Sequence, residues 1–153
     1  LIEPYFGNRT KRLIKSPKLV FLDSGLAAFL AGFRTEQDLF ASSLADSFWE
    51  SYVIGQVIRH ASFSGAQANI SYWRTAGGAE VDLIIERSGG KVLAVECKYK
   101  ERPASSDSAG LRAMADAEKG RIKERYVVCR TNVSYRLSDG AWAMNPSEFL
   151  KTL

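Results

Sequence analysis

The sequence predicts an α/β protein in which a central sheet of mixed direction carries helices on both of its faces. Three observations support this fold class. Residues 79–98 contain two alternating segments around a Gly-Gly pair, as in a β-hairpin. Residues 44–61 are an apolar-rich segment of helical length, and residues 126–129 are a short apolar run typical of a strand covered on both faces. A helix predicted over residues 105–119 lies between the hairpin and that run, so it can cross over the sheet.

The first 22 residues are expected to form a short hairpin or wing that includes a buried strand over residues 19–22. Five basic side chains gather in this segment against one acid, Glu3. They either contact phosphates or form an ordinary solvated face. The basic residues are Arg9, Lys11, Arg12, Lys15 and Lys18.

Two short helices and one long helix are expected next. Asp23 and Thr35 can each cap a short helix, and Gly32 can end the first one. The long helix over residues 44–61 has apolar residues around most of its circumference, which predicts that it is largely buried. Glu50 lies on an apolar stripe of this helix and needs a partner. It either reaches outward, pairs with an arginine, or points into the same pocket as the acids of the hairpin.

The hairpin belongs to a three-stranded meander. Its first strand is expected over residues 69–74, and the hairpin over residues 79–98 supplies the second and third strands. A loop made of Ser88, Gly89 and Gly90 fixes how the two hairpin strands pair. The meander therefore forms the centre of the predicted sheet.

This pairing places acids and a lysine next to one another. Because side chains alternate along a strand, Glu80, Asp82 and Ile84 are expected on one face. The loop sets Asp82 opposite Glu96 and Glu80 opposite Lys98. Acids opposite one another repel, so the Asp82–Glu96 pair predicts either a bound cation or a protonated acid. An ordinary solvated face with a Glu80–Lys98 cross-strand pair is the alternative.

The chain is expected to close with a small hairpin that turns at residues 139–140 and with a short helix. Asn145, Pro146 and Glu148 fit the N-cap, the first position and the third position of that helix.

Composition limits the function classes. The 153 residues suit one domain with a real core. The net charge of +4 leans toward anionic partners, and an ordinary soluble surface is the alternative that the charge alone does not exclude. No apolar run reaches transmembrane length and no secretory signal opens the chain, so a cytoplasmic protein without a membrane partner is expected. Cys97 and Cys129 are expected to be buried thiols, and two cysteines with one histidine disfavour a zinc site. No phosphate-binding loop motif occurs, so this chain should not hydrolyse ATP.

The acids and lysine suit phosphodiester hydrolysis with Mg²⁺ or Mn²⁺, because such ions bind carboxylates and activate water. Asp82 and Glu96 are the predicted metal ligands, together with the backbone carbonyl of Cys97. Lys98 is the predicted catalytic cation that acts on the water or the phosphate. Glu50 is predicted to complete the site, with Glu80 as the alternative acid. Arg74 either binds phosphate or pairs with Glu80.

The spacing of Asp82 and Glu96-x-Lys98, with an acid on the preceding helix, resembles the PD-(D/E)xK nucleases, which have a restriction-endonuclease-like fold. One departure is Val81, where that superfamily has proline. Blocks along nearly the whole chain also resemble an uncharacterised C-terminal domain of prokaryotic AAA-type ATPases. These blocks are residues 15–26, 48–50, 72–74, 79–82 and 95–99.

The resemblance implies that residues 23–153 are a nuclease-like domain and that residues 1–22 are the remnant of a winged-helix-like segment. It implies a metal-dependent DNA nuclease that belongs to a longer chain with an ATPase module. Two alternatives stay open: an inactive module that binds nucleic acid, and a module that docks partners or oligomerises the ATPase. The predicted DNA contacts are Arg74, Lys100, Arg9, Lys11 and Arg12.

Overall fold

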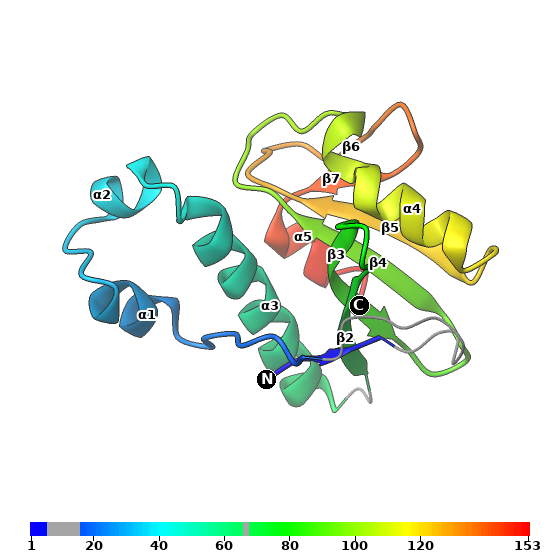
Figure 1. The fold of residues 1–153 in the computed structure, drawn as a ribbon, viewed down its shortest axis with the longest axis horizontal. Coiled ribbons are helices and arrows are strands. Elements are labelled where there is room, and N and C mark those ends of the chain that lie inside the picture. Colours follow the sequence, from blue (N-terminus) through cyan, green and yellow to red (C-terminus); the bar gives the residue numbers. More distant parts are fainter. Residues whose placement is uncertain (6–15, 66–67) are drawn as a thin grey trace.

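A computed structural model describes residues 1–5, 16–65 and 68–153 of the chain. The described residues form one sheet with helices on both sides (Figure 1). Four of the basic residues expected near the N-terminus lie outside the described residues: Arg9, Lys11, Arg12 and Lys15.

The sheet has mixed direction, as the sequence predicts. Parallel pairing joins β1 to β2, β4 to β5 and β5 to β7, whereas the meander β2–β3–β4 and the β6–β7 pair are antiparallel. In spatial order the strands are β1 (Glu3–Pro4), β2 (Asn69–Arg74), β3 (Glu80–Glu86), β4 (Val92–Cys97), β5 (Ile122–Val128), β7 (Trp142–Met144) and β6 (Tyr135–Arg136).

The helices begin where the sequence supplies caps. Asp23 accepts a hydrogen bond from the first turn of α1, Thr35 from that of α2, and Asn145 from that of α5. The helices are α1 (Ser24–Leu30), α2 (Glu36–Ala41), α3 (Ala45–Ser64), α4 (Ala109–Ala117) and α5 (Pro146–Leu150), with a 3₁₀ turn over Ser105–Ser108 that leads into α4.

Two buried clusters cover the two faces of the sheet. On one face α3 and α5 pack over β-strand residues such as Leu83 and Ile85. On the other face α4 packs over residues that include Val81 and Ile84. The long helix and the crossover helix therefore cover opposite faces, which confirms that part of the prediction. The buried residues of α3 are Ala45 at its start and a group in its middle, around Val53 to Val57, so the expectation of a largely buried helix is only partly met.

A β-bulge corrects the predicted faces of the hairpin. The β2–β3 register passes from Ser71–Ile84 to Trp73–Val81, so one β2 residue faces two β3 residues, Asp82 and Leu83. Val81 and Ile84 consequently pack in the same core cluster although they are three residues apart. Simple alternation was wrong here, because Asp82 and Ile84 do not alternate regularly across the bulge. The hairpin itself is confirmed: Leu83 pairs with Val95, in the register that the three-residue loop predicts.

The N-terminal residues add an edge strand to the sheet. β1 pairs with β2, and Ile2 forms an isolated bridge to Lys18 through two backbone hydrogen bonds of 2.9 Å. Ile2 and Tyr5 are buried in the core. The predicted buried strand over residues 19–22 is wrong, because the segment is not extended into the sheet and Leu19 and Leu22 are exposed. The winged-helix origin of residues 1–22 stays a prediction.

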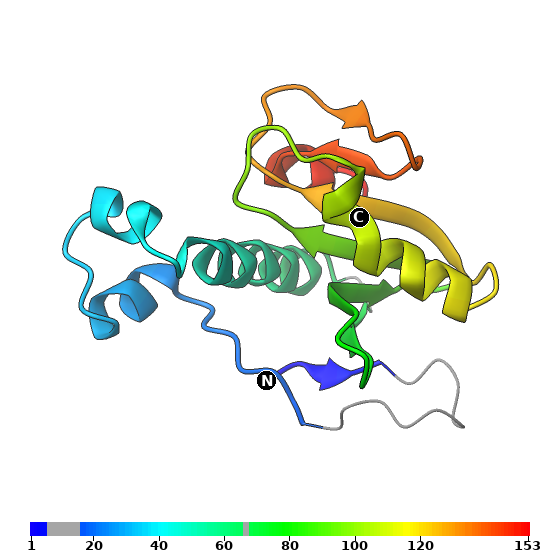
Figure 2. The ribbon, with the colours of Figure 1, turned by 45° about the horizontal axis from the view of Figure 1, so that its top comes forward.

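The two short helices α1 and α2 extend away from the sheet and contact α3 (Figures 1 and 2). Phe40 of α2 also stacks on the Tyr99 ring, with the ring centroids 4.9 Å apart. Several large apolar side chains on the two helices face solvent, among them Phe29, Leu30 and Phe40. No helix in the described part of the chain is long and apolar enough to cross a bilayer.

Candidate functional site

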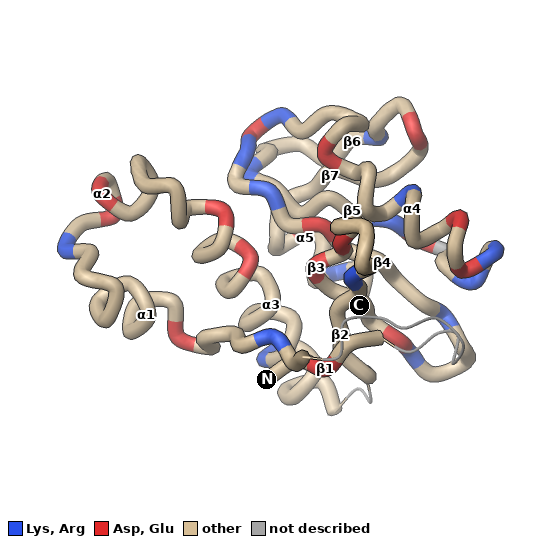
Figure 3. Tube along the Cα trace, in the orientation of Figure 1, with Lys and Arg blue, Asp and Glu red and all other residues tan. Residues whose placement is uncertain are grey.

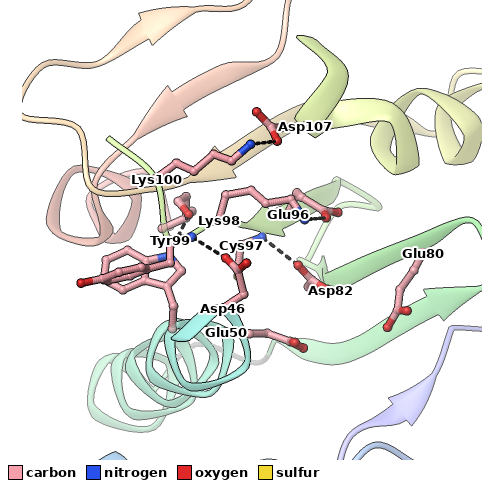
Figure 4. A network of polar contacts seen from close by, with 12 residues as sticks. Asp46, Glu50, Glu80, Asp82, Glu96, Cys97, Lys98, Tyr99, Lys100 and Asp107 are labelled. Atoms are coloured by element: carbon pink, nitrogen blue, oxygen red, sulfur yellow. Dashed lines mark hydrogen bonds and ion pairs between the residues drawn. The ribbon is translucent and has the colours of Figure 1, made fainter. Parts of the chain in front are cut away.

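Four predicted site residues meet where β3 and β4 run past the N-terminal half of α3 (Figure 4). Asp82 comes from the bulged part of β3, Glu96 from the end of β4, and Lys98 from the residues just after it. Glu50 leaves α3 and points toward β3. Figure 3 shows how acidic positions of α3, β3 and β4 gather in this part of the molecule.

The two carboxylate oxygens of Asp82 differ in their contacts: Oδ2 is hydrogen-bonded, whereas Oδ1 is only weakly paired. Asp82 is nine-tenths buried, and its Oδ2 accepts a hydrogen bond of 2.8 Å from the backbone N–H of Cys97. Its Oδ1 lies 3.8 Å from the ammonium of Lys18. Burial raises the pKa of Asp82, although the hydrogen bond from Cys97 and the charges of Lys18 and Lys98 act in the opposite direction.

The two carboxylate oxygens of Glu96 also differ in their contacts. Glu96 is also nine-tenths buried, and its Oε1 pairs with the Lys98 ammonium at 2.9 Å. Its Oε2 is buried without a hydrogen-bond partner among the residues that the structure describes. Burial, and then the charge of Asp82, raises the pKa of Glu96 to about 8. A buried polar oxygen without a partner is costly, so Glu96 Oε2 has capacity left for a ligand.

Glu50 joins the cluster through a lysine that the sequence analysis did not assign to the site. The Lys18 ammonium contacts Glu50 Oε1, lies 3.1 Å from Glu80 Oε1 and also approaches Asp82. Burial, and then the charge of Asp82, raises the pKa of Glu50 to about 7 even though Lys18 opposes the shift. Burial alone would lower the pKa of Lys18, but the surrounding acids outweigh it and raise that pKa.

Lys18 therefore belongs to the acidic cluster rather than to a solvated basic face. A sequence signal for it existed: three acids were expected in one place with a single lysine, and such a group needs a further cation. The distance in sequence hid the partner, because Lys18 reaches the cluster only through the pairing of its backbone with Ile2.

The remaining predicted residues take other partners. Arg74 pairs with Glu80 at 3.5 Å, as one of its two alternatives predicted. The Glu80–Lys98 pair is wrong, because Glu80 pairs with Lys18 and Arg74 whereas Lys98 pairs with Glu96. Lys100 forms an ion pair of 2.6 Å with Asp107. Cys97 and Cys129 are free and buried, as expected.

The acids suit a metal held by two carboxylates rather than by a cage. Within the described ranges, no three Asp, Glu, Cys or His side chains lie close enough together to hold one metal ion. Mg²⁺ nevertheless binds through one or two carboxylates and keeps several waters. Glu96 Oε2 has no hydrogen-bond partner among the described residues, Asp82 Oδ1 has only an ion pair of 3.8 Å with Lys18, and burial is the main cause of the raised pKa of both acids. These two residues therefore fit a hard divalent cation, whereas Glu50 is occupied by Lys18.

Comparisons with known proteins give a family but no activity. The family model described as "Domain of unknown function (DUF4143)" matches residues 45–149. The chain is 30% identical over 151 residues to an uncharacterized protein of Mycobacterium bovis and to one of Mycobacterium tuberculosis. Each alignment covers 99% of this chain but only 32% of the relative, so the chain spans about a third of their length. No solved structure matches it.

Proposed function

Because this chain belongs to the DUF4143 family of domains of unknown function, we propose an activity from its site: a metal-dependent nuclease-like domain that hydrolyses phosphodiester bonds in DNA. One observation carries the proposal. Asp82 and Glu96 each have one oxygen fixed by a protein donor, while Glu96 Oε2 has no hydrogen-bond partner among the described residues and Asp82 Oδ1 has only an ion pair of 3.8 Å with Lys18. Such a pair is preorganised for a cation, and Lys98 stands next to it.

Each residue of the site has a distinct role in the proposed reaction. Asp82 and Glu96 would hold Mg²⁺ or Mn²⁺ with the Cys97 carbonyl, and the ion when bound would polarise the phosphate and activate a water. The Cys97 N–H keeps Asp82 oriented, because it fixes Oδ2 and leaves Oδ1 free. Lys98 is half-buried and fully charged at neutral pH, since its pairing with Glu96 outweighs burial and raises its pKa. Its ammonium is positioned to neutralise charge that develops on the phosphate oxygens.

The arrangement of strands and helices supports a restriction-endonuclease-like core in this proposal. A mixed sheet, an antiparallel β3–β4 hairpin with the acids, a helix with Glu50 on one face and a crossover helix on the other are what a restriction-endonuclease-like core would need. We also propose a cytoplasmic location and an ATPase module in the longer chain. Arg74 and Lys100 remain proposed DNA contacts, although phosphate would have to compete with Glu80 and Asp107 for them.

The test is a cleavage assay with supercoiled plasmid, linear duplex, single-stranded DNA and RNA in Mg²⁺ or Mn²⁺. Asp82→Asn and Glu96→Gln keep the shape of each side chain and remove its charge, so each should abolish metal binding and cleavage. Glu101→Gln is the matched control, because Glu101 is an exposed acid in the loop after Lys98. Chelator should stop the wild-type reaction. The longer chain should be assayed too, since other parts of it can hold the substrate.

Cleavage that survives in both Asp82→Asn and Glu96→Gln would identify a contaminant and defeat the proposal. Metal binding without cleavage of any substrate would favour a second function, in which the domain docks a partner or oligomerises the ATPase.

A specific observation favours that second function. The α1–α2 extension forms an open groove of about 430 Å³ against α3, lined by Phe29, Phe33, Phe40, Phe48 and Trp49. Phe29 is 60% exposed and Leu30 is 65% exposed, which is unusual for neighbouring large apolar residues. Replacing Phe29 and Leu30 by serine should weaken self-association or binding to the remainder of the longer chain if docking is the function, and should leave cleavage unchanged.

A further inference from the structure

We propose that Lys18 is a tethered cation that competes with the divalent metal for the Asp82 carboxylate, so that metal binding requires the Lys18 ammonium to move away from Asp82. This inference rests on the proposed metal site at Asp82 and Glu96 and adds its regulation. Two independent features support it: the position of the Lys18 ammonium and the unpaired buried oxygen of Glu96.

The ammonium occupies the place where a cation would be bound. It contacts Glu50, donates a hydrogen bond of 3.1 Å to Glu80 Oε1 and lies 3.8 Å from Asp82 Oδ1. That oxygen is the one that the Cys97 N–H leaves free. An ion on Asp82 Oδ1 and the ammonium would be neighbouring like charges in a mostly buried site, where their repulsion is screened far less than in water. Simultaneous binding is therefore unfavourable.

The local structure lets the ammonium leave without unfolding the sheet. The Lys18 backbone is fixed by its bridge to Ile2, and the Tyr72 hydroxyl donates a 2.5 Å hydrogen bond to the Ser16 carbonyl two residues earlier. The charged end sits on a flexible four-carbon stem, and its side chain keeps a quarter of its surface exposed. A rotation of the side chain can thus carry the ammonium into solvent while β1 and β2 stay paired.

The carboxyl groups of the cluster also outnumber its cations: Glu50, Glu80, Asp82 and Glu96 face Lys18, Lys98 and Arg74. Lys18 serves Glu50, Glu80 and Asp82, and Lys98 serves Glu96. Arg74 contributes only to Glu80. A divalent ion would supply more charge than the ammonium that it displaces, and released Lys18 would be free to meet the anionic substrate. The Lys18 ammonium therefore pairs with the acids in the absence of metal and is released from them when metal binds.

Terbium luminescence tests the competition directly. Tb³⁺ binds hard oxygen ligands, and the Tyr72 ring, 5.9 Å from the Lys18 ammonium, can sensitise its emission. Titration of the wild-type protein and Lys18→Met, followed by displacement with Mn²⁺, gives the affinity for both ions. Because Lys18→Met removes a close like charge, its dissociation constants should fall about tenfold or more. Lys151→Met is the matched control: it removes the same charge from an exposed pair with Glu148, and its affinity should equal that of the wild type.

A second measurement needs no variant, so it holds even if Lys18→Met folds poorly. Acetylation of the wild-type protein, followed by peptide mass spectrometry, should show Lys18 slow to react without metal and several-fold faster with saturating Mn²⁺. Lys151 should react at the same rate in both conditions.

The outcomes separate this inference from the proposed function. Equal affinity in wild type and Lys18→Met, or a Lys18 reactivity that metal does not change, overturns the competition while the metal site stands. Absence of binding in both proteins overturns the competition and the metal requirement of the proposed function together. Tighter binding in Lys18→Met without cleavage of any substrate supports the competition and counts against the nuclease.

Discussion

Asp139 and Glu96 are both mostly buried carboxylates near α4, and their surroundings differ in the number of donors. Asp139 Oδ2 accepts hydrogen bonds from Ser108 at 2.7 Å and from Arg112 at 2.9 Å, and its Oδ1 accepts one from the backbone of Ala141. Burial would raise the pKa of Asp139, but these donors together lower it. At Glu96 a single lysine faces one oxygen, and the pKa rises to about 8.

The two acids differ in how many of their carboxylate oxygens have a donor, and this decides whether each can still bind a ligand. Where every oxygen of a buried acid has a donor, the acid joins two segments and has no capacity left for a ligand. Where one oxygen is left without a donor, as at Glu96, burial favours the protonated acid, and a cation would favour its ionised form instead. The 3₁₀ turn and α4 connect the two places, because they carry Ser108 and Arg112 toward Asp139 and Gly110 toward Glu80.

Gly110 gives the largest expected effect on this arrangement. A Cβ at this position would lie 1.8 Å from the Glu80 carbonyl oxygen and 3.6 Å from Glu96 Oε2. Gly110→Ala must push α4 away from β3, so we expect a loss of about 3 kcal/mol in the free energy of unfolding, at the upper end for overpacked sites. Urea unfolding followed by circular dichroism measures it.

Gly77→Ala is the control for that substitution. Gly77 lies in the turn before β3, and the nearest atom to its added Cβ would be a Thr75 hydroxyl at 3.8 Å, an ordinary contact. Its stability should stay within about 0.5 kcal/mol of the wild type. Equal effects of the two alanines would mean that α4 does not approach β3 as closely as described.

Lys98 tests whether the underbalanced site is catalytic. Lys98→Ala should lower the rate of DNA cleavage about 100-fold, within the range for loss of a transition-state charge, which corresponds to about 2.7 kcal/mol. Metal affinity should change little or rise, because a positive charge beside Glu96 is removed. Lys100→Ala, which removes the next lysine and its pair with Asp107, should retain most of the rate. If Lys98 only stabilises the fold, cleavage will persist and only the melting temperature will fall.

The raised pKa values predict that metal-free protein loses stability as pH rises. In the folded state Glu50 and Glu96 keep their protons up to a higher pH than in the unfolded state, where a glutamate has its ordinary pKa of 4.5. This stabilisation is fully present below about pH 4.5 and is lost as pH rises through about 7 and 8. Glu96→Gln should therefore match the wild type near pH 5 and exceed it by roughly 2 kcal/mol near pH 9, since coupling to Asp82 divides the gain.

Chelator-treated protein is needed for this comparison, because bound metal would favour the ionised acids. Urea unfolding at several pH values measures the effect, and Glu101→Gln should show no such trend. A wild-type stability that increases between pH 6 and pH 9 would contradict the charge imbalance at the site.

The sequence was sufficient for the parts of the fold that local physics determines. The Asp23, Thr35 and Asn145 caps, the Gly-Gly turn and the register of the hairpin each depend on neighbouring residues, and each appears as predicted. The register of the hairpin follows from its loop, so the approach of Asp82 to the end of β4 could also be predicted.

Contacts between distant segments could not be predicted in the same way. The bulge at Asp82 is set by the pairing of β3 with β2, which no periodic pattern in β3 alone reveals. Lys18 lies 62 residues before the Glu80 that it contacts, and it enters the site because its backbone pairs with Ile2. Gly110 has an ordinary helical position, and its need for a missing Cβ arises only from the closeness of the Glu80 backbone. Each of these depends on tertiary packing rather than on local propensity.

Asp139→Asn gives the smallest effect and completes the comparison. The substitution keeps the shape of the side chain but removes the charge that Arg112 and Arg125 face. We expect a loss of about 1–2 kcal/mol near pH 7, since charge-assisted hydrogen bonds are lost in a partly solvated place. Because the pKa of Asp139 is lowered from 3.8, its contribution is present above that value and lost as pH falls through the folded pKa. The loss of stability in Asp139→Asn should therefore vanish in strong acid. Glu96→Gln has the opposite sign, because that variant should be more stable than the wild type at high pH.

Glu148→Gln is the control for Asp139→Asn. Glu148 forms an exposed pair with Lys151, so this substitution should change stability by less than about 0.5 kcal/mol. Cleavage should persist in Asp139→Asn, and its complete loss with the fold intact would place Asp139 in the site.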